Sequence, residues 1–491
     1  MEPMNEDKIV DQAAAVASAI FGVTAVAFSA AWFYCIYYYV WTGTRQFNSA
    51  LNIALLICLP AILAVCAVGA LRLPPAARVS VAVLWSSTAV SMYALEALLT
   101  FWPWLIGGSD LDTAMRPQIA ASFGVKFDQR EVIEVLTDLQ ARGVDAVPTV
   151  YPADFLDQQP GGSLRSVIRI KNEEVLPLSG ISNKSSVLCN ENGAYTIYQS
   201  DEHGFHNPKG IWKSDRLDIA VVGDSFAHGF CVPSENNFVS LIRRHYPATL
   251  SLGMGGNGPL LELAAVKEFL PILKPRIVLW AYFEKNDWNE LRNEARAPRL
   301  LQYLKPGFRQ DLISRQSDLD QALLAYVEEQ KPQALLRLRE SRDAKSFDKL
   351  SKIAKLSALR AKLGLATNQR QLEKQRTAAD EAADRALFRA VLQQAKTTVE
   401  SWDGILYFVY LPPWERYAAP GTAKKNRETV LQMLASLKIP VIDVHASFQS
   451  HGDPLSFFPF RRSGHYNLEG NQVVAVTVID RLLADRVLES P

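Results

Sequence analysis

The second half of the chain carries short apolar segments that alternate with helical patterns. Five of these segments are continuous runs rich in branched and aromatic residues: Leu217–Val222, Ala248–Leu252, Arg276–Phe283, Gly404–Leu411 and Pro440–Val444. Runs without polar alternation are typical of parallel strands that are covered on both faces. Helical patterns over Asn237–Tyr246 and Leu260–Leu273 separate the first three strands. This order predicts an α/β fold with an open, doubly wound parallel sheet.

The N-terminal part is of a different kind. Between Gln12 and Gly108 the charged residues are Arg45, Arg72, Arg78 and Glu96. Apolar runs long enough to cross a bilayer as helices extend over Ala13–Val40, Leu51–Leu71 and Val79–Ile106. Aromatic residues typical of a membrane interface, among them Trp41, Trp102 and Trp104, follow the first run and end the third. We expect about three transmembrane helices in residues 1–108. A signal peptide followed by core helices is the alternative, but the first run is too long for one.

Loop charges predict the orientation of these helices. Arg72 and Arg78 lie between the second and third runs, whereas Ser109–Asp112 after the third run is acidic. The positive-inside rule places the arginine-containing loop in the cytoplasm. Lys8 agrees with a cytoplasmic N-terminus, and Arg45 disagrees. The remainder of the chain is then expected on the outer face of the membrane.

Charge and cysteine content narrow the choice of partners. The formal net charge of +1 and the pI of about 7.6 indicate no nucleic-acid partner. Cys189 and Cys231 lie outside the apolar runs and could form a disulfide in an oxidising compartment; two buried thiols are the alternative. A bridge would tether the helix after Ser225 to the upstream segment. No cysteine and histidine spacing is typical of a metal site, so no metal is expected.

The remaining chain divides into a leading segment and a larger domain. We interpret residues 109–215, which are rich in turn residues after a helical pattern over Arg130–Gly143, as an irregular cover on the core; a separate small domain is the alternative. Residues 216–491 form the sheet domain. Its interruption at about 309–402 is highly charged and poor in glycine and proline, which predicts inserted helices with solvated faces. A lid or partner-binding arm is the alternative.

Two residues are candidates for nucleophilic chemistry. Ser225, in Gly223-Asp224-Ser225-Phe226, stands at the carboxyl end of the first strand, where α/β enzymes hold nucleophiles. A turn of small residues without a catalytic role is the alternative. His465 follows the last strand and precedes an apolar helix over Val473–Leu483, which makes it the candidate base. The alternative is an ordinary surface histidine.

Donors for an oxyanion are expected at the same edge of the sheet. The backbone N–H of Ser225 is one. Gly256 lies in the glycine-rich loop after the second strand, where the backbone can approach a ligand closely. Asn286 follows the third strand, and its amide can donate to the same oxygen. A flexible turn and a strand-end asparagine are the respective alternatives.

The sequence thus has a serine, a glycine, an asparagine and a histidine, in this order and each expected at the end of a strand. With this pattern, residues 215–485 resemble the SGNH (GDSL-type) hydrolase superfamily. The resemblance implies a three-layer α/β/α, flavodoxin-like domain. It also implies Ser225 as nucleophile, His465 as base, and an oxyanion hole of Ser225, Gly256 and Asn286, with Gly253 as second match for the glycine. It implies no metal and no other cofactor.

Two positions depart from the superfamily's motifs. Glu284 stands where its Gly-x-Asn-Asp motif has glycine. Arg462 stands where its Asp-x-x-His motif has the aspartate that orients the histidine. We take Asp453 as the candidate acid, and a Ser–His dyad that uses a backbone carbonyl as the alternative.

A membrane anchor with an SGNH-like domain further resembles bacterial proteins that add or remove acyl groups on cell-surface polysaccharides. This likeness implies a serine esterase or O-acyltransferase at the bacterial inner membrane, with its C-terminal domain in the periplasm or outside the cell. The expected partners are the bilayer, an acylated (first of all acetylated) glycan and a separate membrane acyltransferase. Two functions compete: a non-catalytic glycan-binding or assembly component of polysaccharide export, which Arg462 and Glu284 favour, and a lipid esterase.

Overall fold

A computed structural model describes residues 6–37, 41, 54–101, 109–354, 356–357, 359, 377–418 and 424–488. Its internal contacts divide the chain into two compact units. The first comprises residues 1–107 and 343–375, and the second comprises residues 108–342 and 376–491. The leading segment and the sheet domain therefore belong to one unit.

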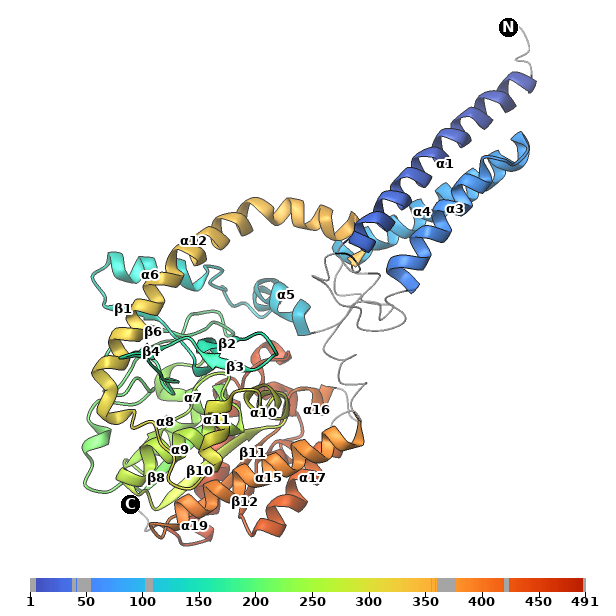
Figure 1. Cartoon of the computed structure of the whole chain (residues 1–491). Coiled ribbons are helices and arrows are strands. Elements are labelled where there is room, and N and C mark those ends of the chain that lie inside the picture. Colours follow the sequence, from blue (N-terminus) through green and yellow to red (C-terminus); the bar gives the residue numbers. More distant parts are fainter. Residues whose placement is uncertain are drawn as a thin grey trace. The chain divides into compact units, whose positions relative to one another are not determined.

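Apolar helices make up most of the first unit (Figure 1): α1 (Glu6–Ile36), α3 (Leu59–Ala70), which continues from the π-helical turn η2 (Ala54–Cys58), and α4 (Pro75–Phe101). Small residues form their mutual contact, which lets the backbones approach closely: Ala17, Ala67 and Ala82. Two of the described helices, α1 and α4, are long and apolar enough to cross a membrane, and α3 is shorter. Arg45, Trp102 and Trp104 lie outside the described residues.

Five parallel strands form the central sheet of the second unit: β8 (Ile219–Gly223), β9 (Thr249–Ser251), β10 (Ile277–Phe283), β11 (Ile405–Leu411) and β12 (Val441–Asp443). The observed ends lie no more than two residues from those predicted. The spatial order β12-β11-β10-β8-β9 is the flavodoxin-like order. Strand order reverses between β8 and β10, and the carboxyl ends of strands at such a switch point are where ligands bind.

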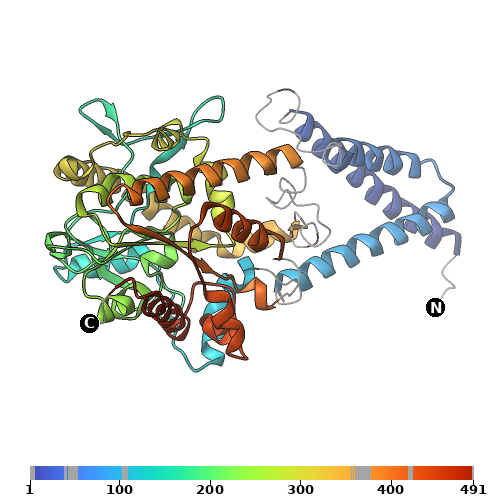
Figure 2. The same ribbon diagram turned by 90° about the horizontal axis from the view of Figure 1, so that it is seen from below.

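Helices cover both faces of this sheet (Figure 2). One face packs against α9 (Pro259–Leu273), α15 (Ala378–Glu400) and α17 (Lys424–Leu437). The other packs against α8 (Phe238–His245), α18 (Val444–Ser450) and α19 (Leu468–Ala484). Side chains alternate between the two cores along each strand, as with Val221 and Val222 of β8. The predicted three-layer α/β/α arrangement is confirmed.

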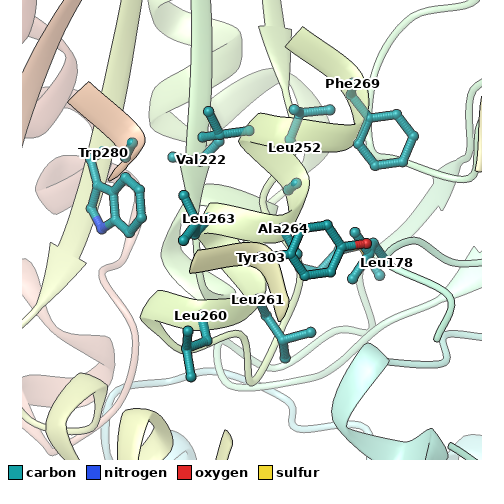
Figure 3. Close-up of a cluster of buried hydrophobic side chains, with 14 of the residues drawn as sticks. Leu178, Val222, Leu252, Leu260, Leu261, Leu263, Ala264, Phe269, Trp280 and Tyr303 are labelled. Carbon is teal, nitrogen blue, oxygen red and sulfur yellow. The ribbon is translucent and has the colours of Figure 1, made fainter. Parts of the chain in front are cut away.

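Helix α9 is enclosed on nearly all sides, and its side chains from Pro259 to Leu270 are buried. Figure 3 shows its leucines packed among side chains of the sheet, the leading segment and the short helix η7 (Gln302–Leu304), including Val222, Trp280, Leu178 and Tyr303. A helix that is apolar all round is stable only in such a setting. Glu262, on the same helix, is therefore buried too.

The leading segment packs on the sheet domain. It contains α5 (Ser109–Ser122), α6 (Val132–Ala141) and a small sheet of β1 (Ala146–Pro148), β6 (Ser185–Val187) and β7 (Ile197–Gln199). In the sequence, two antiparallel strand pairs come after β1 and before β6. They are β2 (Leu156–Gln158) with β3 (Leu164–Ser166), and β4 (Arg169–Ile170) with β5 (Glu173–Glu174). Phe155 and Leu176 of this segment are fully buried in the core that contains α9. The segment is thus continuous with that core.

Several helices lie between β10 and β11: α10 (Asp287–Glu294), α11 (Pro298–Leu301), α12 (Gln316–Ala354) and α15. The last of these buries Phe388, Val391, Leu392, Ala395 and Val399. Since α15 belongs to a covering layer of the sheet, part of the charged interruption is integral to the fold.

Candidate active site

Ser225 stands at the sharp turn between β8 and the short helix α7 (Ser225–His228). Asp224 caps this helix, and its carboxylate accepts a hydrogen bond of 2.9 Å from the Phe226 N–H. A Cβ at Gly223 would meet Ala227 Cβ and Ala281 O at 2.9 Å, so only glycine allows the close approach of this turn to β10. The turn leaves the Ser225 side chain at the carboxyl edge of the sheet.

A chain of hydrogen bonds connects three side chains at this edge. Ser225 Oγ lies 2.8 Å from His465 Nε2, and His465 Nδ1 lies 3.1 Å from Glu191 Oε1. The other oxygen of Glu191 accepts a 2.8 Å hydrogen bond from the His465 backbone N–H. With the ring proton on Nδ1 directed to Glu191, Nε2 is left to accept the proton of Ser225. The arrangement is that of a serine, histidine and acid triad.

Glu191 is held in its charged form. Burial would raise its pKa, but the charge and hydrogen bonds of His465 and the charge of Arg116 outweigh burial and lower the pKa to about 2. Arg116 Nη1 lies 3.3 Å from Glu191 Oε1, and Arg116 Nη2 donates to Ser463 O at 2.9 Å. The glutamate side chain is 16% exposed. Arg116 therefore links Glu191 to the loop that carries His465.

The candidate acid Asp453 is wrong. Arg461 binds both of its carboxylate oxygens, at 2.6 and 2.9 Å, in an exposed pair on the surface. Glu191 instead occupies the place beside His465, and the dyad with a backbone carbonyl is not what the structure shows. The Asp-x-x-His motif gives no signal for Glu191, because that motif concerns only the sequence just before His465.

The disulfide considered in the sequence analysis indicates which segment lies close to Ser225, and that segment contains Glu191. Cys189 and Cys231 are bonded to each other, so the disulfide, and not the alternative of two buried thiols, is what the structure shows. Glu191 follows Cys189 by two residues, and Asn192 donates a 2.7 Å hydrogen bond to the Cys231 carbonyl. The bridge thus brings the glutamate to the segment after α7. Cys231 also lies near Glu191 and His465, but its sulfur is in the disulfide and no thiolate is available for a metal.

The expected oxyanion donors Asn286 and Gly256 have different surroundings in the structure. Asn286 stands at the N-cap position of α10 without a capping hydrogen bond, and both hydrogens of its Nδ2 are directed at carboxylates, Asp224 Oδ2 at 3.2 Å and Glu290 Oε1 at 2.7 Å. One of these contacts must open before Asn286 can donate to a substrate. Gly256 is exposed and has a positive φ of 73°. Gly253 is buried against α7, where a Cβ would meet the Ala227 carbonyl carbon at 2.4 Å, so packing requires glycine there. Oxyanion donation by Gly256 and Asn286 remains a prediction.

The motif departure at Glu284 has a structural partner. Its carboxylate accepts a 2.9 Å hydrogen bond from Arg416 Nε, and a second, shorter contact joins it to Arg416 Nη2. Arg416 also donates to Tyr410 Oη at 3.0 Å. Both charged side chains are buried, with exposures of 4% and 9%. The glycine of the motif is thus replaced by one half of a buried ion pair.

A cavity of about 240 Å³ opens beside His465. Aromatic side chains line one part of it, Phe226, Phe283 and Trp414, and the Lys285–Glu415 ion pair lines another. The imidazole contacts Phe226, with ring centroids 4.9 Å apart. His465 therefore borders a small cavity that is lined by both apolar and charged side chains.

No protein-family model matches the chain, and no curated protein matches it. Among solved structures, it is similar to the lipase/acylhydrolase from Enterococcus faecalis (14% identity over 56% of this chain and 99% of that one, TM-score 0.30). It is also similar to LAE5, an alpha/beta hydrolase enzyme from the metagenome of Lake Arreo (14% identity over 57% of this chain and 100% of that one, TM-score 0.30). A further similar structure is CEX, a two-domain esterase active on acetylated mannans (10% identity over 57% of this chain and 53% of that one, TM-score 0.30). These proteins are described as ester-cleaving or related hydrolases. The function proposed below rests on the geometry of the site.

Proposed function

We propose that the chain is a serine esterase or O-acyltransferase of the SGNH type. The supporting observation is the continuous hydrogen-bonded series from Glu191 through His465 to Ser225. In the proposed reaction Ser225 Oγ attacks the ester carbonyl carbon while His465 Nε2 takes its proton. The ester C–O bond then breaks, and His465 returns the proton to the departing alcohol. Water or a sugar hydroxyl takes the acyl group from Ser225, which gives hydrolysis or transfer respectively.

Glu191 replaces the missing aspartate in this proposal. As a carboxylate it holds His465 in the tautomer that accepts a proton at Nε2, and it stabilises the imidazolium that forms during attack. The backbone N–H of Ser225, with Gly256 and Asn286, is the proposed oxyanion hole.

The proposed substrate is a short acyl ester, first of all an acetyl ester, of a cell-surface glycan. The cavity beside His465, at about 240 Å³, is smaller than sites that take drug-sized ligands, which favours a short acyl group over a long fatty chain. A lipid esterase is the second candidate. Nitrophenyl acetate should be cleaved faster than nitrophenyl esters of long acyl chains, and the reverse order would favour the lipid esterase.

We propose that the apolar helices anchor the chain in a bacterial inner membrane, with about three spans and the second unit on the periplasmic side. Two lines support this: α1 and α4 have the length and composition of membrane spans, and the Cys189–Cys231 disulfide suits an oxidising compartment. A membrane acyltransferase that supplies the acyl group is the proposed partner.

A fluorophosphonate probe tests the esterase proposal, because an activated serine attacks its phosphorus, becomes phosphonylated and releases fluoride. The full-length chain in detergent should be labelled, and Ser225→Ala and His465→Ala should abolish labelling. Ser450→Ala, at an exposed serine at the end of α18, serves as the matched control and should be labelled like the wild type. A folded wild-type chain that takes no label would favour the non-catalytic glycan-binding or assembly role.

A further inference from the structure

Four carboxylates gather beneath the turn that carries Ser225. Asp224 lies between β8 and α7, Glu262 lies in the first turn of α9, and Asp287 and Glu290 lie in the first turn of α10. One oxygen from each of Asp224, Asp287 and Glu290 lies within 4.8 Å of the others. Three different elements of the fold thus direct acidic groups to one place.

These carboxylates are removed from water. Asp224, Glu262 and Asp287 have no measurable exposure, and Glu290 is half-buried. Glu262 interacts electrostatically with the carboxylates of Asp224, Glu294, Glu290 and Asp287.

Several oxygens in this cluster have no donor. Neither Glu262 oxygen accepts a hydrogen bond, and the same holds for Asp287 Oδ1, Glu290 Oε2 and the amide oxygen of Asn286. Glu294 differs, because its oxygens accept N–H groups of Gly258 and Leu260 at 2.6 and 2.8 Å. Buried polar atoms are normally satisfied, so a fully buried carboxylate without any donor calls for an additional partner.

The described part of the chain supplies no basic partner for these acids. None of Asp224, Glu262, Asp287 and Glu290 forms an ion pair with a described lysine or arginine. The described positive group that interacts with Asp224 is His465. One imidazole does not neutralise four carboxylates, and buried charges that lack a partner bind a cation or a proton.

The spacing suits a hard cation. Oxygens that bind one Ca²⁺ at about 2.4 Å lie no more than about 4.8 Å apart, and the oxygens of Asp224, Asp287 and Glu290 meet this condition. Carboxylates on one buried site, with the free amide oxygen of Asn286 beside them, match the oxygen ligands that Ca²⁺ takes in numbers of about six to eight. Mg²⁺ more often keeps its waters and uses one or two carboxylates.

We propose that Asp224, Glu262, Asp287 and Glu290 form a binding site for a divalent cation, with Ca²⁺ preferred to Mg²⁺. The cation would lie directly below the Ser225 turn and would fix β8 to α9 and α10. The ligands come from positions between 224 and 290 and show no short motif, which is why the sequence predicts no metal. The site stands independently of the ester chemistry.

Calorimetric titration tests this site without any activity assay. The full-length chain in detergent is treated with a chelator, freed of it, and titrated with CaCl₂ and separately with MgCl₂. The wild type should bind one Ca²⁺ per chain saturably, and at least about tenfold more tightly than Mg²⁺. Glu262→Gln and Glu290→Gln should each weaken Ca²⁺ binding at least about tenfold, whereas Asp480→Asn, at an exposed acid on α19, should bind like the wild type.

Thermal unfolding separates lost binding from lost folding. Without a cation, Glu262→Gln should unfold at the same temperature as the wild type or higher, because it removes an unpartnered buried acid. Added Ca²⁺ should raise the midpoint of the wild type and not that of the variant. The proposal is overturned if the folded wild type binds no Ca²⁺, in which case protons neutralise the cluster, or if both variants bind as the wild type does. Tighter binding of Mg²⁺ would overturn the preference for Ca²⁺.

Discussion

The disulfide between Cys189 and Cys231 joins the segment that carries the triad glutamate to the segment that follows the nucleophile. Glu191 lies two residues after the first cysteine, and Ser225 lies six residues before the second. The acid of the proposed triad thus comes from the leading segment, and the nucleophile and base come from the sheet domain. The covalent bridge keeps these two segments next to each other.

Replacing both bridging cysteines with serine should lower activity and stability together. The bridge closes a loop with a sequence separation of 42, for which the chain-entropy relation gives about 4 kcal/mol. Without it, the Glu191 segment should move away from His465, so kcat should fall more than KM changes. Thermal unfolding and ester hydrolysis measure the two effects. Cys66→Ser, at a free cysteine in α3, is the control, and equal behaviour of the two variants would contradict the prediction.

Glu191→Gln should reduce kcat about 10⁴-fold with little change in KM, the loss seen when a triad acid is replaced. The amide cannot stabilise the imidazolium and can favour the wrong tautomer of His465. Asp453→Asn, at the acid first expected from the sequence, should leave kcat unchanged because its partner is Arg461. Steady-state kinetics of the two variants decide between the two acids, and a large loss in Asp453→Asn would reverse the assignment.

The stability that Glu191 supplies should depend on pH. Its pKa is lowered from 4.5 to about 2 in the folded chain. A carboxyl with a depressed pKa stabilises the fold fully above its unfolded pKa, and this stabilisation is lost as the pH falls towards the folded value. The midpoint of the wild type should therefore exceed that of Glu191→Gln at pH 6, and the difference should shrink from pH 4.5 to pH 3. Thermal unfolding at each pH measures this difference in midpoint. A difference that stays constant from pH 4.5 to pH 3 would show that the carboxylate charge is not its source.

Arg416→Ala should destabilise the second unit by about 3–5 kcal/mol, because it leaves the Glu284 carboxylate buried without its partner. The double variant Glu284→Gln/Arg416→Gln removes both charges and should recover much of the loss. Denaturant unfolding of wild type, single and double variants measures this. If the single and double variants were equally unstable, packing rather than charge would explain the effect.

Much of the fold followed from local patterns. Continuous apolar runs predicted β8, β10 and β11 closely, because strands buried on both faces must be apolar throughout. The nucleophile was predicted for a related reason, since ligands bind at the carboxyl ends of parallel strands. His465 was expected at the end of the last strand, but it lies in the loop before α19, with α18 between it and β12. Packing still brings Ser225 and His465 within hydrogen-bond distance although 240 residues separate them.

The same reasoning did not extend to the acid or to the acidic cluster. Glu191 is 274 residues from His465, in a segment without regular periodicity, and it arrives there through packing and the disulfide. Glu262 looks like an ordinary polar position in an apolar helix until that helix is seen to be enclosed on all sides. No local spacing records either relationship.

By itself, the sequence determined the order of strands and helices, the placement of Ser225 and Asn286 after strand ends and that of His465 before the last helix, because hydrophobic period and turn residues act locally. The tertiary structure alone decided which carboxylate meets His465 and which acids lie together below Ser225. Those contacts join elements far apart in the chain, and they exist only once the leading segment and the helices have packed on the sheet.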